Sequence, residues 1–419
     1  MSQIVIIGGG FAGVWSAAAA ARVREQAGIE AADLPIALLS PGKEMVIRPR
    51  LYESQPDMMG IPLDSILEPV AVQHIRAAAS DIDTASRRIT VSAAGGAARE
   101  MSYTSLVLAS GSQLLAPTLP GAEHLHDVDT MAAAVALDRH LHGLPSRPTQ
   151  DGRFTAVVVG SGFTGIEVAT EMVTRLHAIA EPHHPADDVR VILIERADVI
   201  GPELGSGPRP VLLEALAELG IEKRLRTTVV SLDDRSVQLS DGSTIPAHTA
   251  IWTAGMRANP LTERIPGSRD ELGRLKVDPY LSVMGVPGVF AAGDTAVAEL
   301  ESGHRTMQSC QHAHAMGRLA GHNAAAEILG VSLAPFEPEP YVTCLDLGQA
   351  GAVLTAGWDR EVKLTGPPAK QLKRKINQTI YPPVDDAAEI LKRADFQAAS
   401  RTQLRGRPRA ATVESPAAS

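Results

Sequence analysis

Residues 4–13 read IVIIGGGFAG, an apolar run that passes directly into a glycine-rich turn. Gly8, Gly10 and Gly13 fit the G-x-G-x-x-G pattern found between a strand and a helix. There the first glycine allows a tight turn, the second admits a pyrophosphate close to the backbone, and the third lets helix and strand pack. Free N–H groups at the helix N-terminus would bind the phosphates. A dinucleotide-binding turn is predicted, and the alternative is a glycine-rich turn without a ligand.

A second copy of the pattern follows a second apolar run. Residues 156–159 read AVVV and residues 160–165 read GSGFTG, again before a helical pattern. The next strand, at residues 191–194, ends in Glu195. A carboxylate there accepts hydrogen bonds from the hydroxyls of an adenosine ribose and repels a 2′-phosphate. Two dinucleotides are therefore predicted, with NADH favoured at the second turn, although Arg196 beside the acid leaves NADPH open.

The first turn lacks the acid that usually accompanies it. Its next strand, at residues 35–39, ends in Ser40. A hydroxyl can hydrogen-bond a ribose, but without the charge that strengthens such a bond. We expect adenosine to be held more weakly there or to be supported by other groups.

Around both turns, β-branched runs alternate with alanine-rich helical patterns, which is typical of parallel sheets covered by helices. The predicted fold class is α/β, with two Rossmann-like three-layer domains and a small C-terminal α+β domain. The expected boundaries are 1–118 with 256–332 for a discontinuous FAD-binding domain, 119–255 for an NAD-binding domain, 333–395 for a capping or acceptor domain, and 396–419 for a disordered tail.

Composition excludes several classes of protein. The 419 residues carry 39 basic and 48 acidic side chains, a net charge of -9, which argues against a nucleic-acid partner. Cys310 and Cys344 are the only cysteines, so no disulfide framework or C-x-x-C centre is encoded. The N-terminus lacks the basic segment of a signal peptide, and no apolar run is long enough to span a bilayer. We expect a cytoplasmic protein, with a peripheral position at the inner face of the membrane as the alternative.

A third motif, VFAAGD at residues 289–294, completes an order of motifs that resembles the two-dinucleotide-binding flavoproteins. In these proteins the acid, here Asp294, hydrogen-bonds the ribityl chain of FAD. Residues 106–111 (LVLASG) and 251–260 (IWTAGMRANP) are similar to the two chain crossings between the dinucleotide-binding domains. The second crossing resembles that of type II NADH dehydrogenases and apoptosis-inducing-factor-like reductases.

This resemblance implies an enzyme, an FAD-dependent oxidoreductase that passes a hydride from NADH to FAD and on to a small acceptor: a quinone-like compound, a dye or oxygen. Residues 48–53 (RPRLYE) would lie along the flavin, and Glu53 stands where ferredoxin reductases usually carry lysine. That difference argues against an iron–sulfur protein as acceptor. Two other functions stay open: a biosynthetic or detoxifying reductase with a dedicated organic substrate, and an NADH-sensing redox switch with little turnover.

One segment departs from the family pattern. Residues 310–317 (CQHAHAMG) occupy the place of the family's AQxAxQQG. Gln311 and Gly317 match, but Ala315 and Met316 replace the glutamine pair implicated in quinone binding. A quinone acceptor therefore does not follow from the resemblance alone.

Hydride transfer requires the protein chiefly to position two cofactors and to tune the flavin. By resemblance, Cys310 and Gln311 begin a helix whose positive end faces the flavin, and Glu167 lies near the nicotinamide and relays protons. Cys310 and His314 share a helix face, as two zinc ligands would, but no further ligands are evident and no metal is predicted. A redox pair of Cys310 with Cys344 is a weaker alternative.

The candidate catalytic residues are thus Glu167, Cys310 and Gln311. The candidate binding residues for FAD and NADH are Gly8, Gly10, Phe11, Ala12, Gly13, Ser40, Lys43, Arg48, Pro49, Ser110, Gly111, Gly160, Gly162, Phe163, Thr164, Gly165, Glu195, Ala254, Gly255, Gly293, Asp294 and Gln311. Past residue 335, glycine turns between β-favouring runs predict a small sheet. Three aromatic residues of this segment either line the acceptor face or pack in the core: Tyr341, Trp358 and Tyr381. The expected partner is a small-molecule acceptor, and the sequence is compatible with a homodimer and with weak membrane contact through basic residues near Lys370.

Overall fold

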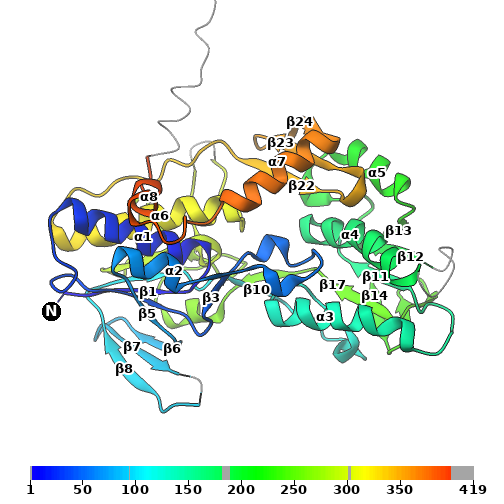
Figure 1. Ribbon diagram of the computed structural model, residues 1–419, viewed down its shortest axis with the longest axis horizontal. Helices are drawn as coiled ribbons and strands as arrows, with labels where there is room; N and C mark the ends of the chain where they lie inside the picture. Colours follow the sequence, from blue (N-terminus) through cyan, green and yellow to red (C-terminus); the bar gives the residue numbers. More distant parts are fainter. Residues whose placement is uncertain (1, 94, 182–188, 301–302, 398–419) are drawn as a thin grey trace, which may run out of the picture.

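The computed structural model describes residues 2–93, 95–181, 189–300 and 303–397 (Figure 1). Of the predicted tail at 396–419, all but the first two residues lie outside the described part of the chain.

A parallel five-stranded sheet forms around the N-terminal strand, in the order β20-β9-β1-β2-β5. The strand β1 is fully apolar and buried, as expected for a strand covered on both faces. The glycine-rich turn follows β1 at the carboxyl edge of the sheet, where ligands bind in open α/β folds. The strands are β1 (Ile4–Ile7), β2 (Ile36–Leu39), β5 (Gln73–Ile75), β9 (Ser105–Leu108) and β20 (Val289–Ala291).

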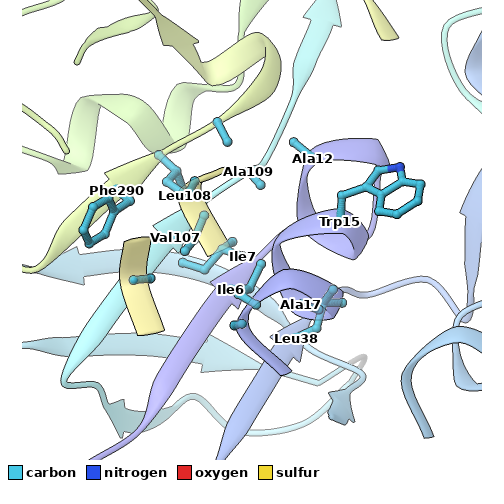
Figure 2. Close-up of a cluster of buried hydrophobic side chains, with 14 of the residues drawn as sticks. Ile6, Ile7, Ala12, Trp15, Ala17, Leu38, Val107, Leu108, Ala109 and Phe290 are labelled. Carbon is cyan, nitrogen blue, oxygen red and sulfur yellow. The ribbon is translucent and has the colours of Figure 1, made fainter. Parts of the chain in front are cut away.

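Two long helices, α1 (Phe11–Gln26) and α6 (Cys310–Leu329), cover this sheet and cross in close contact. A Cβ atom on Gly317 would lie 2.4 Å from the carbonyl oxygen of Ala12, and one on Gly321 would lie 2.0 Å from that of Ser16. Figure 2 shows buried side chains of α1 and of the strands, with the ring of Trp15 on the side of α1 that faces away from Val107 and Leu108. The small residues of the α6 segment therefore serve helix packing as well as any site.

A second parallel sheet, in the order β13-β12-β11-β17, repeats this arrangement. Its strands are β11 (Thr155–Val159), β12 (Arg190–Ile194), β13 (Glu222–Arg224) and β17 (Thr249–Trp252), and its helices are α3 (Met131–Gly143), α4 (Phe163–Ala180) and α5 (Arg209–Glu218). Two antiparallel sheets accompany the parallel ones: β6 (Ala78–Asp83), β7 (Arg88–Ser92) and β8 (Arg99–Ser102), and β14 (Val229–Leu232), β15 (Ser236–Leu239) and β16 (Thr244–Pro246).

The chain passes between the two parallel sheets along paired strands. Strand β10 (Ser112–Leu114) runs antiparallel to β18 (Met256–Ala258). These strands follow the two segments, 106–111 and 251–255, that the sequence resemblance marked as crossings. Shorter elements complete this half: β3 (Glu44–Val46), β4 (Gly60–Pro62), α2 (Asp64–Leu67), β19 (Leu275–Lys276) and β21 (Ala296–Val297).

The predicted C-terminal sheet is present and antiparallel. It consists of β22 (Val342–Asp346), β23 (Ala352–Ala356) and β24 (Glu361–Thr365), followed by α7 (Gly366–Thr379) and α8 (Ala387–Arg393). Leu345 and Val353 join the core of the second parallel sheet, whereas Ile390 of α8 joins that of the first. The C-terminal segment thus packs on both halves, with α7 and the sheet beside α4 and α8 above α1 (Figure 1). The α/β class is confirmed. No helix in the described ranges is long and apolar enough to cross a membrane.

Candidate dinucleotide and redox site

The first glycine-rich turn has the geometry that a pyrophosphate requires. Gly8 has φ +123°, and a Cβ on it would lie 2.1 Å from the carbonyl oxygen of Ala109. A Cβ on Gly13 would lie 1.8 Å from the carbonyl oxygen of Gly8. A Cβ on Gly10, by contrast, would meet nothing within 4 Å. Gly8 and Gly13 are needed by the fold itself, whereas Gly10 leaves open space before the first N–H groups of α1, where a phosphate would be bound.

The second turn repeats these relationships. Gly160 has φ +104°, and a Cβ on Gly165 would lie 1.8 Å from the carbonyl oxygen of Gly160. Gly162 has open space around its Cα and is the N-cap of α4. Ala254 lies against this turn, since its Cβ would be 3.2 Å from a Cβ on Gly160. The same open space thus occurs at two turns, residues 8–13 and 160–165, which we call the first and second cradle.

Several predicted residues lie around the first cradle. A Cβ on Gly9 would lie 2.6 Å from Ser40 Oγ, which places the buried serine against the turn. Ser110 Oγ is buried and has no hydrogen-bond partner in the described part of the chain, as expected for a group that awaits a ligand. Gly293, with φ +70°, approaches Ala12, its added Cβ being 2.8 Å from that of the alanine.

The remaining predicted cofactor-binding residues lie at the first cradle, at the second cradle and at the crossings between the two sheets. Phe11 and Ala12 are buried at the start of α1, Pro49 lies in the short helix Arg48–Arg50, and Lys43 forms a solvent-exposed pair with Glu44. Gly111 and Gly255 both have positive φ, +73° and +84°. Phe163 and Thr164 open α4 beside the second cradle.

Glu195 contacts the second cradle directly. Its Oε2 accepts hydrogen bonds from the backbone N (3.0 Å) and Oγ (2.7 Å) of Ser161, and its Oε1 accepts one from the N of Ala197 (2.8 Å). Burial opposes its charge, but these hydrogen bonds outweigh that effect and lower the pKa of the carboxyl. A carboxylate offers about four acceptor positions, so roughly one remains for a ligand hydroxyl.

Asp294 lies at the end of β20, close to Arg48. Its Oδ2 accepts a hydrogen bond from Ser112 Oγ at 2.6 Å and lies 3.8 Å from Nη1 of Arg48. Arg48 also donates to Ser112 and forms an ion pair with Asp129. Burial raises the pKa of Asp294, although Ser112 and Arg48 oppose the shift. Two candidates that are far apart in the sequence are thus brought together.

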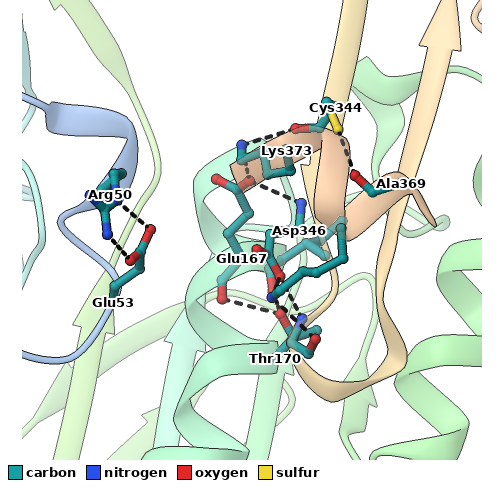
Figure 3. A network of polar contacts seen from close by, with 11 residues as sticks. Arg50, Glu53, Glu167, Thr170, Cys344, Asp346, Ala369 and Lys373 are labelled. Carbon is teal, nitrogen blue, oxygen red and sulfur yellow. Dashed lines mark hydrogen bonds and ion pairs between the residues drawn. The ribbon is translucent and has the colours of Figure 1, made fainter. Parts of the chain in front are cut away.

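Glu167 is the centre of a buried polar network between α4 and α7 (Figure 3). Its Oε1 accepts hydrogen bonds from Lys373 Nζ at 2.7 Å and from the backbone N of Asp346 at 3.0 Å. Lys373 also donates to the carbonyl oxygen of Cys344 at 2.9 Å, and Lys370 pairs with Asp346. The sequence alone indicates a basic surface segment here and does not single out Lys373. The signal that could identify it is its place on the helix, because Lys373 lies on the side of α7 that the fold buries.

The pKa values of Glu167 and Lys373 are both shifted. Burial raises the pKa of Glu167, with Lys373 opposing the shift. For Lys373, burial opposes the charge, but the adjacent carboxylate outweighs it and raises the pKa. The carboxylate thus keeps a proton on the lysine, and burial makes the Glu167 carboxyl a better proton acceptor than an ordinary glutamate. Arg50 and Glu53 form their own ion pair nearby, with Nη2 and Oε2 2.7 Å apart (Figure 3).

Cys310 and Gln311 begin α6, with Ser309 as the N-cap. Burial raises the pKa of Cys310, so it is a neutral thiol, and both cysteines are free. The amide of Gln311 donates to the carbonyl of Pro340 and accepts from the N of Val342, both at 3.1 Å. Its side chain therefore ties the start of β22 to α6. Across the described ranges no cluster of three or more potential metal ligands occurs.

The predicted aromatic residues of the C-terminal segment lie in different places. Tyr341 stacks on His312 at 5.0 Å between ring centroids, and Trp358 stacks on Tyr341 at 4.9 Å. Arg360 packs over the Tyr341 ring at 4.5 Å. Tyr381 is partly buried against the core of the first sheet. Tyr341 and Trp358 thus form a wall at the start of α6, and Tyr381 does not.

Comparison with known proteins agrees with this geometry. The family model described as "Pyridine nucleotide-disulphide oxidoreductase" matches residues 2–317. An NADH dehydrogenase-like protein of Mycobacterium tuberculosis is 43% identical over 412 residues, which cover 97% of this chain and 100% of that protein. The demethylphylloquinone reductase of Synechocystis sp. is 26% identical over 392 residues, covering 91% of this chain and 92% of its own length.

Among solved structures, NDH2 from Plasmodium falciparum in complex with NADH has the same fold. The TM-score is 0.76 at 14% sequence identity, and the match covers 97% of this chain and 99% of that one. FAD and a nicotinamide dinucleotide are the usual cofactors of such proteins, and both cradles described above fit them. The chain therefore belongs to the pyridine nucleotide-disulphide oxidoreductase family, as an NADH dehydrogenase-like, NAD(P)H-dependent flavin oxidoreductase.

Proposed function

We propose that this enzyme oxidises NADH in preference to NADPH and passes the electrons through FAD to a small acceptor of the quinone class. One observation carries this proposal. Both glycine-rich cradles are open, but only the second has a carboxylate, Glu195, beside it. FAD, when bound, supplies the two-electron carrier that accepts a hydride and later releases it. The protein's own residues bind, orient and manage protons.

The assignment of the cradles follows from the residues beside them. Gly8, Gly10 and Gly13, with Asp294 and Ser110, would hold FAD, and Arg48 keeps Asp294 in place. The second cradle would hold NADH. We assign residues 1–118 and 256–332 to the FAD half, 119–255 to the NAD half and 333–395 to the cap.

Glu195 favours NADH for two reasons. Its remaining acceptor position suits a ribose hydroxyl, and its charge, which the lowered pKa maintains at neutral pH, repels a 2′-phosphate. The positive charge of the adjacent Arg196 is one of the causes that lower the pKa of Glu195 and so keep it ionised.

Glu167 and Lys373 would manage the proton that accompanies reduction of the acceptor. The pair is buried, and burial raises the pKa of the Glu167 carboxyl. A proton donor or acceptor is most effective when its pKa lies near the working pH. Cys310, as a neutral thiol at the start of α6, would pack beside the flavin without forming a charge.

A quinone-like acceptor is supported by two relatives whose names state that chemistry. These are the demethylphylloquinone reductase of Synechocystis sp. and a type II NADH:quinone oxidoreductase of Mycobacterium tuberculosis, the latter 27% identical over 370 residues. The overall balance is NADH + H⁺ + quinone → NAD⁺ + hydroquinone.

The test is anaerobic rapid mixing of the purified yellow protein with each nucleotide. We expect the visible flavin absorption to bleach at least about tenfold faster with NADH than with NADPH. The reason is the repulsion between the Glu195 carboxylate and the 2′-phosphate of NADPH. A colourless protein after gentle preparation, or faster bleaching with NADPH, contradicts the proposal.

A further inference from the structure

A cavity of about 170 Å³ opens along α6. Its walls are the α6 residues Gln311, His314, Ala315 and Arg318 on one side and the segment 334–339 with Phe396 on the other. This volume is roughly ten times what a single water requires. The cavity is therefore large enough for a small organic molecule.

Two polar side chains of α6 that line this cavity each have one buried nitrogen without a hydrogen-bond partner among the described residues. His314 and Arg318 are four residues apart, so they lie on one face of the helix. The Nδ1 atom of His314 and the Nε atom of Arg318 are buried, and neither has a hydrogen-bond partner in the part of the chain that the structure describes. Buried polar atoms normally have partners, because leaving one unsatisfied is destabilising. A ligand in the cavity would supply these partners.

The two groups differ in charge. Burial lowers the pKa of Arg318 to about 10, so its guanidinium is still cationic at neutral pH. Burial also lowers the pKa of His314 to about 3, so its imidazole is neutral and can accept or donate one hydrogen bond. The charge of Glu339, on the opposite wall, opposes this lowering of the Arg318 pKa, although no ion pair within 4.0 Å joins the two among the described residues. Glu337 is exposed and Glu339 half-buried on the opposite wall.

The guanidinium of Arg318 is held in a fixed position. It lies over the ring of Trp15, 4.1 Å from the centroid, and the indole Nε1 of Trp15 donates to the carbonyl oxygen of Ile380 at 3.1 Å. Such stacking leaves the edge of the guanidinium available for a planar anion, which it binds through two parallel hydrogen bonds.

The position along the helix sets the orientation of a ligand. Arg318 is seven residues from Gln311, or about 10 Å along the helix axis. A flat molecule whose acidic group reaches Arg318 therefore extends its ring past Ala315 toward the start of α6. Ala315 lies along this path and its small side chain leaves it open.

We propose that this cavity binds an aromatic acceptor that carries a carboxylate or sulfonate, with Arg318 as its charge partner and His314 as its hydrogen-bond partner. The inference rests on the proposed function, since it names the class of acceptor. An acidic quinone takes up two electrons and two protons, the hydride equivalent from NADH and one proton from the medium, and becomes the hydroquinone.

Binding is tested apart from electron transfer, by calorimetric titration of the oxidised, FAD-loaded protein. The probes are naphthalene-2-carboxylate and its neutral amide, which cannot be reduced. We expect saturable binding of the carboxylate at least tenfold tighter than that of the amide. Arg318→Met should remove this preference, and Glu337→Gln, at the exposed wall, should tighten carboxylate binding about twofold. Equal binding of both probes, or a preference that survives Arg318→Met, overturns the proposal.

Separate controls distinguish a folding defect from a change in function. If Arg318→Met fails to fold, Arg318→Lys keeps the charge but not the fork, and it should keep part of the carboxylate preference. In turnover, a naphthoquinone sulfonate should lose at least tenfold in kcat/KM in Arg318→Met relative to wild type, while neutral menadione changes less than threefold. Bleaching of the flavin by NADH should be unchanged in the variant. Failure of that bleaching in the wild type contradicts the proposed function, whereas loss of acceptor discrimination alone contradicts this inference.

Discussion

Lys373 Nζ lies 2.7 Å from Oε1 of Glu167, although 206 residues separate them in the sequence. Both side chains are buried, and the contact joins the helix after the second cradle to the C-terminal helix α7. One ion pair thus joins a helix of the second parallel sheet to the C-terminal segment of the chain. Replacing Lys373 tests what the ion pair contributes to stability, and replacing Glu167 tests its part in proton transfer.

Removing the lysine should destabilise the protein in a pH-dependent way. Lys373→Met leaves Glu167 buried without its cation, a change that costs about 3–5 kcal/mol of unfolding free energy near neutral pH. Its carboxyl pKa, already raised by burial from 4.5, then rises further in the folded state. A group with a raised folded pKa stabilises below its unfolded pKa and loses that contribution as pH rises through the folded value. Stability of the variant should therefore fall from pH 5 to pH 8.

Urea denaturation at several pH values, followed by circular dichroism, measures this effect. Lys375→Met is the matched control, since Lys375 is exposed on the same helix, and it should shift stability by less than about 0.5 kcal/mol. A flat pH profile in Lys373→Met would show that Glu167 is not the titrating group.

Glu167→Gln keeps the shape of the side chain but cannot carry a proton. If Glu167 moves a proton during acceptor reduction, turnover should fall about 100-fold, the lower end of general acid–base contributions. Anaerobic bleaching by NADH should change far less, because hydride transfer itself needs no side-chain proton. Stopped-flow measurement of the two half-reactions separates these steps. Glu171→Gln, one turn along α4 and also with a pKa raised by burial, is the control that should leave both half-reactions within threefold.

Nucleotide preference should depend on Glu195. Glu195→Gln removes the charge while retaining an acceptor for Ser161, so kcat/KM for NADH should fall about tenfold and that for NADPH should rise, since one such contact is worth about 1–2 kcal/mol. Initial-rate assays with both nucleotides and menadione measure the ratio. Asp198→Asn, whose exposed carboxylate pairs with Arg226, is the control. An unchanged NADH to NADPH ratio in Glu195→Gln would mean that specificity lies elsewhere.

The sequence predicted the parts of this fold that local geometry dictates. Gly8, Gly13 and Gly165 are needed because a Cβ would strike nearby backbone, and such constraints appear in the sequence as a spacing of glycines. The parallel strands and the position of Glu195 followed from the same local pattern.

Contacts between distant segments could not be predicted in this way. Lys373 reads as one of several surface lysines until α7 is packed on α4. The amide of Gln311 is bound to the backbone at residues 340–342, which no helix pattern indicates. The pairing of Arg318 with the ring of Trp15 depends on the crossing of α1 and α6.

Two glycines of the second turn should respond to alanine in opposite ways. Gly162 has φ -71° and open space around it, so Gly162→Ala should fold with little loss of stability. Its new methyl group would occupy the space that a pyrophosphate approaches, so the Kd for NADH should rise at least about tenfold, or 1.4 kcal/mol. Gly165→Ala, whose methyl would lie 1.8 Å from the carbonyl oxygen of Gly160, should instead lower the Tm or prevent folding. Thermal unfolding and NADH titration of both variants measure the difference. Unchanged NADH affinity in a folded Gly162→Ala protein would mean that the nucleotide does not lie over this turn.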